Sequence, residues 1–295
     1  MQNLNDLPRV AILLTAYNGE RWLNEQLESI KSQVGIQFDV YVSVDLSNDN
    51  TYELFQKQAA GDSRVNLLAY GERFGGAAPN FYRLITEVNM SGYDFVSFSD
   101  QDDIWHSDKI KRACDTLRTG DADVYASNVT AFWADGHEEL IDKAQPQRLL
   151  DHFFESAGPG CTYVFKREAM LELQAYVRTL TIDINNCVMH DWFSYAFCRA
   201  RGYRWYIDPQ PSMRYRQHEH NQIGANTNWA AYKERFAMIC NKTYRRQVEA
   251  LVEMVAPERL PSLSSRLYLL KNFSQLRRRP RDRYFLLVML LLGIY

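Results

Sequence analysis

Short apolar runs and segments of helical spacing alternate through the first part of the chain. The apolar runs have the length and β-favouring composition of strands, and they cover residues 10–15, 38–44, 65–69 and 93–99. The segments between them place apolar residues three or four positions apart, as in Trp22, Leu23, Leu27 and Ile30. This rhythm predicts right-handed strand–helix–strand crossovers, and therefore a mostly parallel α/β sheet flanked by helices.

The rhythm loosens after residue 123. The pattern then predicts a strand, a turn, a helix and a second short strand, at residues 124–132, 157–162, 190–199 and 204–207. We expect an ordered polar and aromatic loop at residues 213–228. Helices should follow from residue 229 onward, with breaks near Pro257, Pro261 and Pro280.

Three carboxylates stand where the fourth apolar run ends. Asp100, Asp102 and Asp103 fall within four residues, and like charges this close repel one another. Such a cluster favours a bound cation, and the carboxyl end of a strand in an open α/β sheet is also where ligands bind. A divalent metal held there would carry a diphosphate. The alternative is a solvated acidic turn ahead of a helix, with Asp108 near its first turn.

Composition narrows the class of protein. The net charge of −2 argues against a dedicated nucleic-acid binder. The five cysteines are widely spaced and form no C-x-x-C pair, so neither a zinc site nor a disulfide framework is indicated. The first eight residues lack the basic and apolar regions of a signal peptide, so we expect a cytoplasmic protein.

The C-terminal segment departs from this average. Seven basic residues and one acid lie between Arg266 and Arg283, and the twelve residues of 284–295 that follow are uncharged and almost wholly apolar. A helix of that length reaches only about 18 Å, too short for a hydrocarbon core of roughly 30 Å. A basic cluster beside a short apolar helix suits the surface of an anionic membrane. The alternative is a helix docked on the main domain with a basic outer face.

Familiar nucleotide-binding motifs are absent, since no G-x-G-x-x-G and no Walker loop follows the first strand. Residues 71–76 are Gly-rich but wrongly spaced, which favours a flexible loop over a phosphate cradle. Residues 45–51 superficially resemble a calcium loop, yet Asn50 and Gln56 stand where that loop needs Gly and Glu. What remains is a polar strand end, with Asp45 able to accept a hydrogen bond from a base or ribose.

Two polar motifs follow in the second half. Asp191, beside an imidazole at a predicted helix start, could be a general base; the alternative is an N-cap Asp with an incidental His. In residues 215–224, Arg216 could pair with phosphate and His218 could bind a metal or donate to phosphate. A single His in a polar loop is more often only a surface residue.

Taken together, these segments resemble one family. Its motifs stand in order as Thr15–Gly19, Asp45–Thr51, Asp100–Trp105, Gly160–Thr162, His190–Trp192 and Tyr215–His218. The series resembles the family 2 glycosyltransferases of GT-A fold, particularly the bacterial rhamnosyltransferase-like branch that builds surface polysaccharides. The resemblance covers roughly Val10 to Gly224, and the strings DQDDIW and YRQH are its most specific parts. The family commonly has paired acids followed by Gly after the second strand, whereas here Val44 and Leu46 flank Asp45.

The resemblance implies a Rossmann-like GT-A domain at residues 1–228, followed by a helical, basic and apolar extension at 229–295. Within the domain, residues 8–120 would bind the nucleotide and residues 121–228 would form the acceptor side. The implied nucleotide-sugar site consists of Thr15, Tyr17, Asp45, Asp100, Gln101 and Arg216. Mg²⁺ or Mn²⁺ would be held by Asp102 and His218. Asp191 would deprotonate the acceptor hydroxyl in a single inverting displacement.

The resemblance also implies the partners. The expected donor is a nucleotide sugar, best matched by dTDP-L-rhamnose, although UDP-linked hexoses remain open. The expected acceptor is an oligosaccharide or polyprenyl-diphosphate-linked glycan in O-antigen or capsule biosynthesis, reached peripherally at the inner face of the plasma membrane. Two other classes stay open, namely a metal-dependent nucleotidyltransferase and a non-catalytic scaffold or glycan-binding subunit of a membrane assembly.

Overall fold

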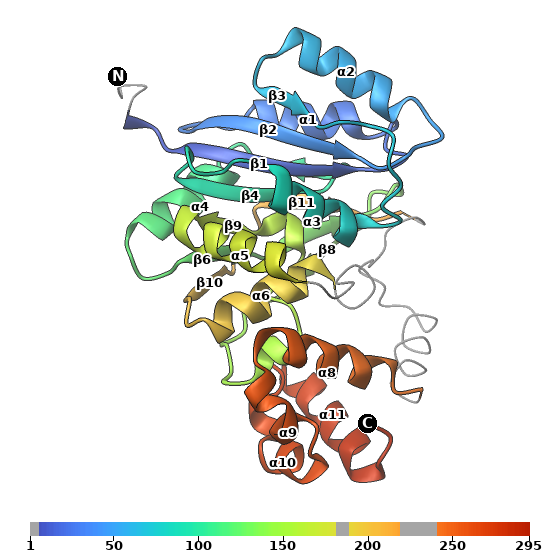
Figure 1. The fold of residues 1–295 in the computed structure, drawn as a ribbon, viewed down its shortest axis with the longest axis vertical. Coiled ribbons are helices and arrows are strands. Elements are labelled where there is room, and N and C mark those ends of the chain that lie inside the picture. The colour runs from blue at the N-terminus through green and yellow to red at the C-terminus, as the bar shows by residue number, and fades with distance from the viewer. Residues whose placement is uncertain (1–5, 181–188, 219–240) are drawn as a thin grey trace.

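A seven-stranded sheet forms the centre of the computed structural model, which describes residues 6–180, 189–218 and 241–295 (Figure 1). Its strands are β1 (Arg9–Ala16), β2 (Gln37–Val44), β3 (Val65–Leu67), β4 (Phe95–Ser99), β6 (Val124–Ser127), β9 (Val164–Lys166) and β10 (Trp205–Asp208). They are ordered β10-β6-β9-β4-β1-β2-β3, and every pair is parallel except the two that β9 makes. The predicted mostly parallel sheet is confirmed.

The register of this sheet brings several polar strand ends together. Ala16 lies opposite Val44, and Ser99 lies opposite Leu14, so β1, β2 and β4 end at one edge. The chain order also reverses between β1 and β4, and such a switch point is where open α/β sheets bind ligands. The residues that follow these strands therefore face one common site.

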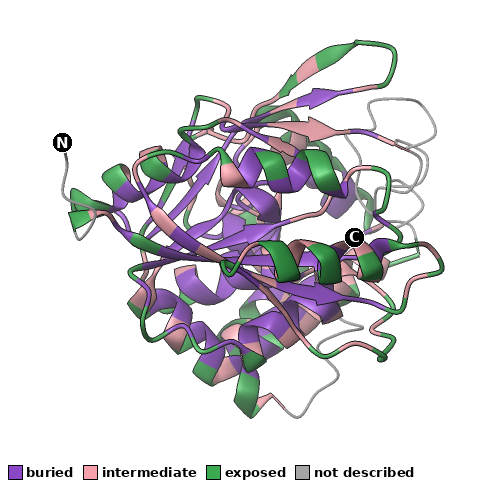
Figure 2. Cartoon of the chain, turned by 90° about the horizontal axis from the view of Figure 1, so that it is seen from above, coloured by how far each residue is buried: buried purple, intermediate pink, exposed green. Residues whose placement is uncertain are grey.

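Helices cover both faces of the sheet. One face carries α3 (Ala77–Glu87), α5 (Arg167–Thr179) and α6 (His190–Ala200), and the other carries α1 (Leu23–Lys31) and α4 (Lys109–Arg118). An eleven-residue helix, α2 (Thr51–Gly61), follows β2. Figure 2 shows the buried strands between helices whose outer faces are exposed. The core is buried on both sides of β1, as expected for a central parallel strand.

A second sheet was not predicted. It has four strands in the order β5 (Ile104–Trp105), β11 (Met213–Arg216), β7 (Val129–Phe132) and β8 (Glu138–Ile141). The single strand predicted at 124–132 is wrong because the chain changes sheets at Asn128, whose side chain donates to Asp142 and to the Pro209 carbonyl. The loop predicted at 213–228 is a strand at its start, while residues 219–228 lie outside the described part of the chain.

The C-terminal helices form a separate layer below the sheet (Figure 1). They are α8 (Thr243–Val255), α9 (Leu260–Leu263), α10 (Arg266–Lys271) and α11 (Pro280–Leu292), with short 3₁₀ turns at Pro257–Arg259 and Phe273–Gln275. The predicted break near Pro280 is the first residue of α11. Their apolar core also includes Leu150, Phe153 and Phe154, so the main domain contributes to it. No helix in the described ranges is long and apolar enough to cross a membrane.

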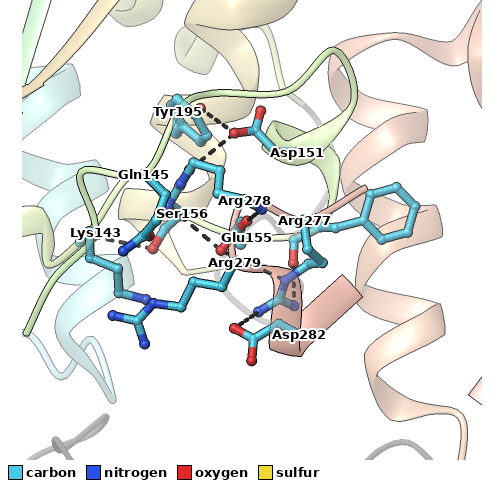
Figure 3. Close-up of polar contacts among 12 residues, drawn as sticks. Lys143, Gln145, Asp151, Glu155, Ser156, Tyr195, Arg277, Arg278, Arg279 and Asp282 are labelled. Carbon is cyan, nitrogen blue, oxygen red and sulfur yellow. Dashed lines mark hydrogen bonds and ion pairs between the residues drawn. The ribbon is translucent and has the colours of Figure 1, made fainter. Parts of the chain in front are cut away.

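Much of the basic C-terminal cluster points inward rather than outward. Arg278 is 1% exposed and lies 3.3 Å from Asp151 and 3.7 Å from Glu155 (Figure 3). Arg277 lies 3.7 Å from Glu155 and 3.8 Å from Asp282. The alternative of a docked helix with a basic outer face is therefore wrong for Arg277 and Arg278, because both pair with carboxylates of the protein.

Candidate active site

The first strand-end loop is held by the side chain of Gln101. Its Oε1 accepts from the Tyr17 N–H at 2.8 Å, and its Nε2 donates to the Tyr17 carbonyl at 2.8 Å. A Cβ on Gly19 would lie 2.1 Å from Gln101 Oε1, so any larger residue here would displace the Gln101 amide. The amide thus positions the loop, while the Tyr17 ring remains 43% exposed at the site. Thr15 is buried within β1.

Reciprocal hydrogen bonds join this loop to the one after β2. Asn18 accepts from the Asn48 N–H at 2.8 Å, and the Glu20 carboxylate accepts from the Asn50 amide at 2.9 Å. Thr51 Oγ1 accepts from the Gly19 N–H at 2.8 Å. Side chains of residues 45–51 therefore support the backbone of the neighbouring loop through Ser47, Asp49 and Thr51.

Asp45 anchors a third loop. Its buried carboxylate accepts from the backbone N–H groups of Phe74 at 2.8 Å and Gly75 at 2.9 Å. Residues 71–76, predicted to be a flexible loop, are thus tethered at their centre. Contact of Asp45 with a base or ribose stays a prediction. We call the ends of β1, β2 and β4, with residues 17–20, 45–51, 71–76 and 100–103, the donor edge.

The acids after β4 differ in burial, since Asp103 is fully buried and Asp102 is partly exposed. Asp103 is fully buried and accepts from the Arg216 N–H at 3.1 Å, and its own N–H donates to Gln26 Oε1 at 2.8 Å. Burial, with the charges of Asp102 and Asp100, raises the pKa of Asp103 well above its usual range. Burial and the Asp102 charge raise the pKa of Asp100 to about 7. Ligand atoms of Asp100, Asp103 and Cys161 lie within 4.8 Å of one another.

Asp102 meets the second predicted metal residue. His218 Nε2 lies 2.7 Å from Asp102 Oδ2, and its ring stacks on Trp22 with centroids 4.1 Å apart. Arg216 Nε donates to the Asp102 carbonyl at 2.7 Å, and its guanidinium also pairs with Glu25. The second sheet explains this meeting, because it pairs β11 with β5 directly after the acids. A phosphate contact by Arg216 stays a prediction.

The side chains of Asp102 and His218 offer ligand atoms that fit a hard divalent cation. A carboxylate and an imidazole on the partly exposed side of the acid cluster are ligands that Mn²⁺ accepts, and carboxylates suit Mg²⁺. The buried group of Asp100, Asp103 and Cys161 is the alternative, and burial raises the pKa of the Cys161 thiol well above its usual range. Metal binding by Asp102 and His218 stays a prediction.

Asp191 lies in the first turn of α6, against the short 3₁₀ helix η3 (Gly160–Thr162). A Cβ on Gly160 would lie 3.0 Å from Asp191 Cβ and 2.5 Å from His190 Nε2, so this turn also needs a glycine. Burial raises the pKa of Asp191 to about 6, opposed by the Trp192 N–H and by the positive charge of Lys143. Such a carboxyl is ionised at neutral pH and remains a useful base.

The neighbouring histidine has a different role. His190 is buried and stacks on Phe81 with centroids 3.9 Å apart. Burial lowers its pKa to about 3, so the ring is neutral. The imidazole therefore packs the core beneath Asp191 rather than exchanging a proton with it.

Sequence reasoning missed three residues that shape the site. Gln26 occupies a buried position on α1, and its amide among apolar positions was the available signal. Lys143 lies near Asp191, and Arg279 lies near Lys143, through long-range packing that no local pattern marks. We call η3, the first turn of α6, Lys143 and residues 277–279 the base side.

Comparisons with known proteins agree with this geometry. Residues 11–169 match the sequence profile described as glycosyl transferase family 2. The dTDP-rhamnosyl transferase RfbG of Shigella flexneri is 43% identical over 289 residues, covering 96% of this chain and 100% of that protein. The Escherichia coli UDP-Glc:alpha-D-GlcNAc-diphosphoundecaprenol beta-1,3-glucosyltransferase WfgD is 24% identical and covers 55% of this chain and 61% of its own.

Solved structures support the fold. S. aureus TarS residues 1–349, in complex with UDP-GlcNAc, superposes with a TM-score of 0.59 at 13% identity, covering 91% of this chain and 73% of that one. The Pyrobaculum calidifontis mannosyltransferase PcManGT, in complex with GDP-Man and Mn²⁺, gives 0.52 at 16% identity, covering 99% and 82%. The fold is therefore GT-A, and the chain is a glycosyltransferase that belongs to glycosyl transferase family 2.

Proposed function

We propose that this enzyme transfers L-rhamnose from dTDP-L-rhamnose to a lipid-linked or oligosaccharide acceptor during surface polysaccharide synthesis. The near full-length similarity to a dTDP-rhamnosyl transferase supports this donor. We also propose that residues 1–228 act as the transferase domain, with the nucleotide at 8–120 and the acceptor at 121–228. Residues 229–295 then form a docked helical extension.

One observation carries the assignment of the reaction centre. The Cys161 thiol lies within 4.8 Å of the ligand atoms of Asp100 and Asp103, while its neighbour Gly160 packs directly against Asp191. The short helix η3 thus contacts both the acid cluster and the candidate base, Asp191. A donor seated on the acids would present its sugar toward Asp191.

Asp191 acts as the general base in this proposal. Its carboxylate takes the proton of an acceptor hydroxyl, whose oxygen forms a bond to the anomeric carbon while the bond from that carbon to the diphosphate breaks. The nucleoside diphosphate leaves from the opposite face, so one displacement inverts the configuration. The N-terminal end of α6 stabilises the ionised form of Asp191 before the proton arrives.

Asp102 and His218 would hold Mg²⁺ or Mn²⁺. When bound, such a cation offsets the negative charge that develops on the leaving diphosphate. The ring of Trp22 keeps His218 in place by stacking, and Gln101 keeps the Tyr17 loop in place for the nucleoside. Thr15, Asp45, Asp100 and Arg216 would complete the donor site.

The first experiment measures thermal stabilisation by dTDP, UDP and GDP, each with and without Mn²⁺. We expect the largest Mn²⁺-dependent shift with dTDP. The same shift should vanish in Asp102→Asn, a change that keeps the shape and removes the charge. Stabilisation by UDP alone would replace the proposed donor, and unchanged dTDP stabilisation of Asp102→Asn would remove this residue from the metal site.

The second experiment follows transfer itself. Purified enzyme, dTDP-L-rhamnose and a polyprenyl-diphosphate-linked glycan should release dTDP and yield a rhamnosylated product. Nuclear magnetic resonance of the product should show the anomeric configuration opposite to that of the donor. Retention of configuration would contradict a single displacement with Asp191 as base.

A membrane surface is the proposed location of the acceptor. One face of α11 is apolar and exposed, and with Leu267 of α10 it comprises Tyr284, Phe285, Val288, Leu291 and Leu292. The opposite face is buried in the helical core through Leu286, Met289 and Leu290. A helix docked by one face and apolar on the other suits the interface of a bilayer, with Arg281 and Lys271 exposed beside it.

Deleting the whole segment would be a poor test, because it would also remove buried residues. We instead expect that Phe285→Ser with Val288→Ser and Leu292→Ser weakens cosedimentation with anionic vesicles while the fold persists. Leu140→Ser with Leu149→Ser, both exposed elsewhere, is the matched control. Equal sedimentation of the two variants would exclude α11 as the membrane contact.

A further inference from the structure

Two cations on the base side form no ion pair with any residue that the structure describes. Lys143 lies in the loop after β8, and Arg279 immediately precedes α11 (Figure 3). Across the described ranges, the Lys143 ammonium makes no hydrogen bond or ion pair, and the Arg279 guanidinium donates only to the Asp142 carbonyl. The Asp142 carboxylate instead accepts from Asn128 and Gln145. These two positive charges are therefore uncompensated by ion pairs.

Their neighbours show that this is not a general lack of acids. Arg277 and Arg278, which adjoin Arg279 in sequence, share Glu155, and each has a further carboxylate in Asp282 or Asp151. Lys143 remains a cation at neutral pH, because burial and the nearby arginines lower its pKa only to about 8. Glu155 also acts on Lys143, and Arg279 acts on Asp142, yet within the described ranges neither cation forms an ion pair as the two arginines do.

Lys143 lies beside the base, and Arg279 lies near Lys143. The Lys143 side chain would meet a Cβ on Gly158 at 3.6 Å, and Asp191 would meet one on Gly160 at 3.0 Å. Two residues of chain span at most about 7 Å, so both side chains border the same turn. The positive charge of Lys143 also acts directly on Asp191. Anything bound to this pair would be close to the acceptor hydroxyl.

We propose that Lys143 and Arg279 bind the diphosphate of a lipid-linked acceptor and thereby present its glycan to Asp191. A guanidinium and an ammonium are the groups that proteins use for phosphate oxygens, and two adjacent cations match a diphosphate. This inference rests on the proposed function and names the acceptor class. The apolar face of α11 begins within two turns of Arg279, so the diphosphate and its prenyl chain meet consecutive parts of the molecule.

The test uses farnesyl diphosphate as the probe. Isothermal titration calorimetry of the full chain, saturated with dTDP and Mn²⁺ to fill the donor site, should detect its binding. Lys143→Gln and Arg279→Gln should each raise the dissociation constant by about tenfold, the usual size of a lost hydrogen bond between charged groups. Lys57→Gln, which removes an exposed cation from α2, should leave it unchanged.

Folding and rescue are checked in the same series. Lys143→Arg keeps the charge and should retain most of the affinity, whereas a melting temperature near that of the parent shows that Lys143→Gln is folded. Farnesol, which lacks the diphosphate, should not distinguish any of the variants. Equal affinity of Lys143→Gln, Arg279→Gln and the parent for farnesyl diphosphate would overturn the proposal, as would no binding to the parent.

Two further measurements distinguish a phospholipid ligand and a failure of the proposed function. A phospholipid headgroup would be the ligand if both variants lost binding to anionic vesicles and kept their affinity for farnesyl diphosphate, and that result would also overturn the proposal. Failure of the proposed function gives a different pattern. In that case dTDP does not stabilise the enzyme and no sugar is transferred, yet farnesyl diphosphate binding still depends on Lys143 and Arg279.

Discussion

The donor edge and the base side differ in how they are assembled. The donor edge comes from one stretch of about the first hundred residues, where short loops after β1, β2 and β4 bind one another through backbone N–H groups. The base side combines η3, α6, the loop after β8 and the start of α11, which lie far apart in sequence. Its arginines contact carboxylates and backbone carbonyls of the main domain from the C-terminal helices.

The two regions also carry opposite charge. Acids dominate the donor edge and raise one another's pKa, as for Asp100 and Asp103. Cations dominate the base side, where they lower the pKa of Lys143 and oppose the rise at Asp191. The opposite charges agree with the two ligands proposed above, a metal-bound diphosphate at the donor edge and an acceptor diphosphate at the base side.

Removing the candidate base should give the largest difference between an effect on turnover and an effect on donor binding. We expect Asp191→Asn to lower turnover by about 10²–10⁴-fold, the usual contribution of a general base, because the amide cannot take a proton. Affinity for dTDP with Mn²⁺ should stay near that of the parent, since the donor edge is intact. Steady-state kinetics and nucleotide titration measure the two effects, and near-native turnover would remove Asp191 from this role.

The next largest effect concerns the link between the main domain and the C-terminal helices. Arg278→Met leaves Asp151 and Glu155 buried with fewer partners, so we expect the free energy of unfolding to fall by about 3–5 kcal/mol. Arg281→Met is the matched control, because its pair with Asp282 is exposed and contributes about 0–1 kcal/mol. Urea denaturation compares them. Similar losses in both variants would show that the buried network does not join the two parts.

Alanine substitution of one glycine in each region compares the effects of the two regions on kinetics. Gly160→Ala should press on Asp191 and His190 and lower turnover by about 10²-fold, since small displacements at a reacting centre are costly. Gly19→Ala should press on Gln101 and weaken donor binding instead, with a smaller effect on turnover at saturating donor. Gly61→Ala, where an added Cβ meets nothing within 4 Å, is the control for both. The same kinetic change in Gly19→Ala and Gly160→Ala would mean that the two regions do not act separately.

The smallest expected effect is on pH dependence. A base must be deprotonated to act, and the pKa of Asp191 is raised to about 6, so activity should fall about tenfold for each pH unit below 6 and stay level above it. A profile of turnover at saturating substrates measures this. The residual activity of Asp191→Asn should lack the break, and a break that persists would assign it to another group.

The features that could be predicted from the sequence are those that depend on residues close together in the chain. The strands, the acids after β4 and the first helices follow from apolar periodicity, and Asp102, His218 and Asp191 follow from motif resemblance. The second sheet escaped prediction because β5 has only two residues and β11 lies in a polar motif. Lys143 and Arg279 escaped it because only tertiary packing brings Lys143 to Asp191 and Arg279 to Lys143. The inward position of Arg278 escaped it for the same reason, since its partners stand more than 120 residues earlier.

The late position of the arginines has a consequence for synthesis. Asp142, Asp151, Glu155 and Ser156 leave the ribosome long before Arg278 and Arg279 are added. All strands of the donor edge are also complete by then. A nascent chain can therefore assemble the donor edge while the base side still lacks its last contacts. Under the proposed function, donor binding would then become possible before transfer.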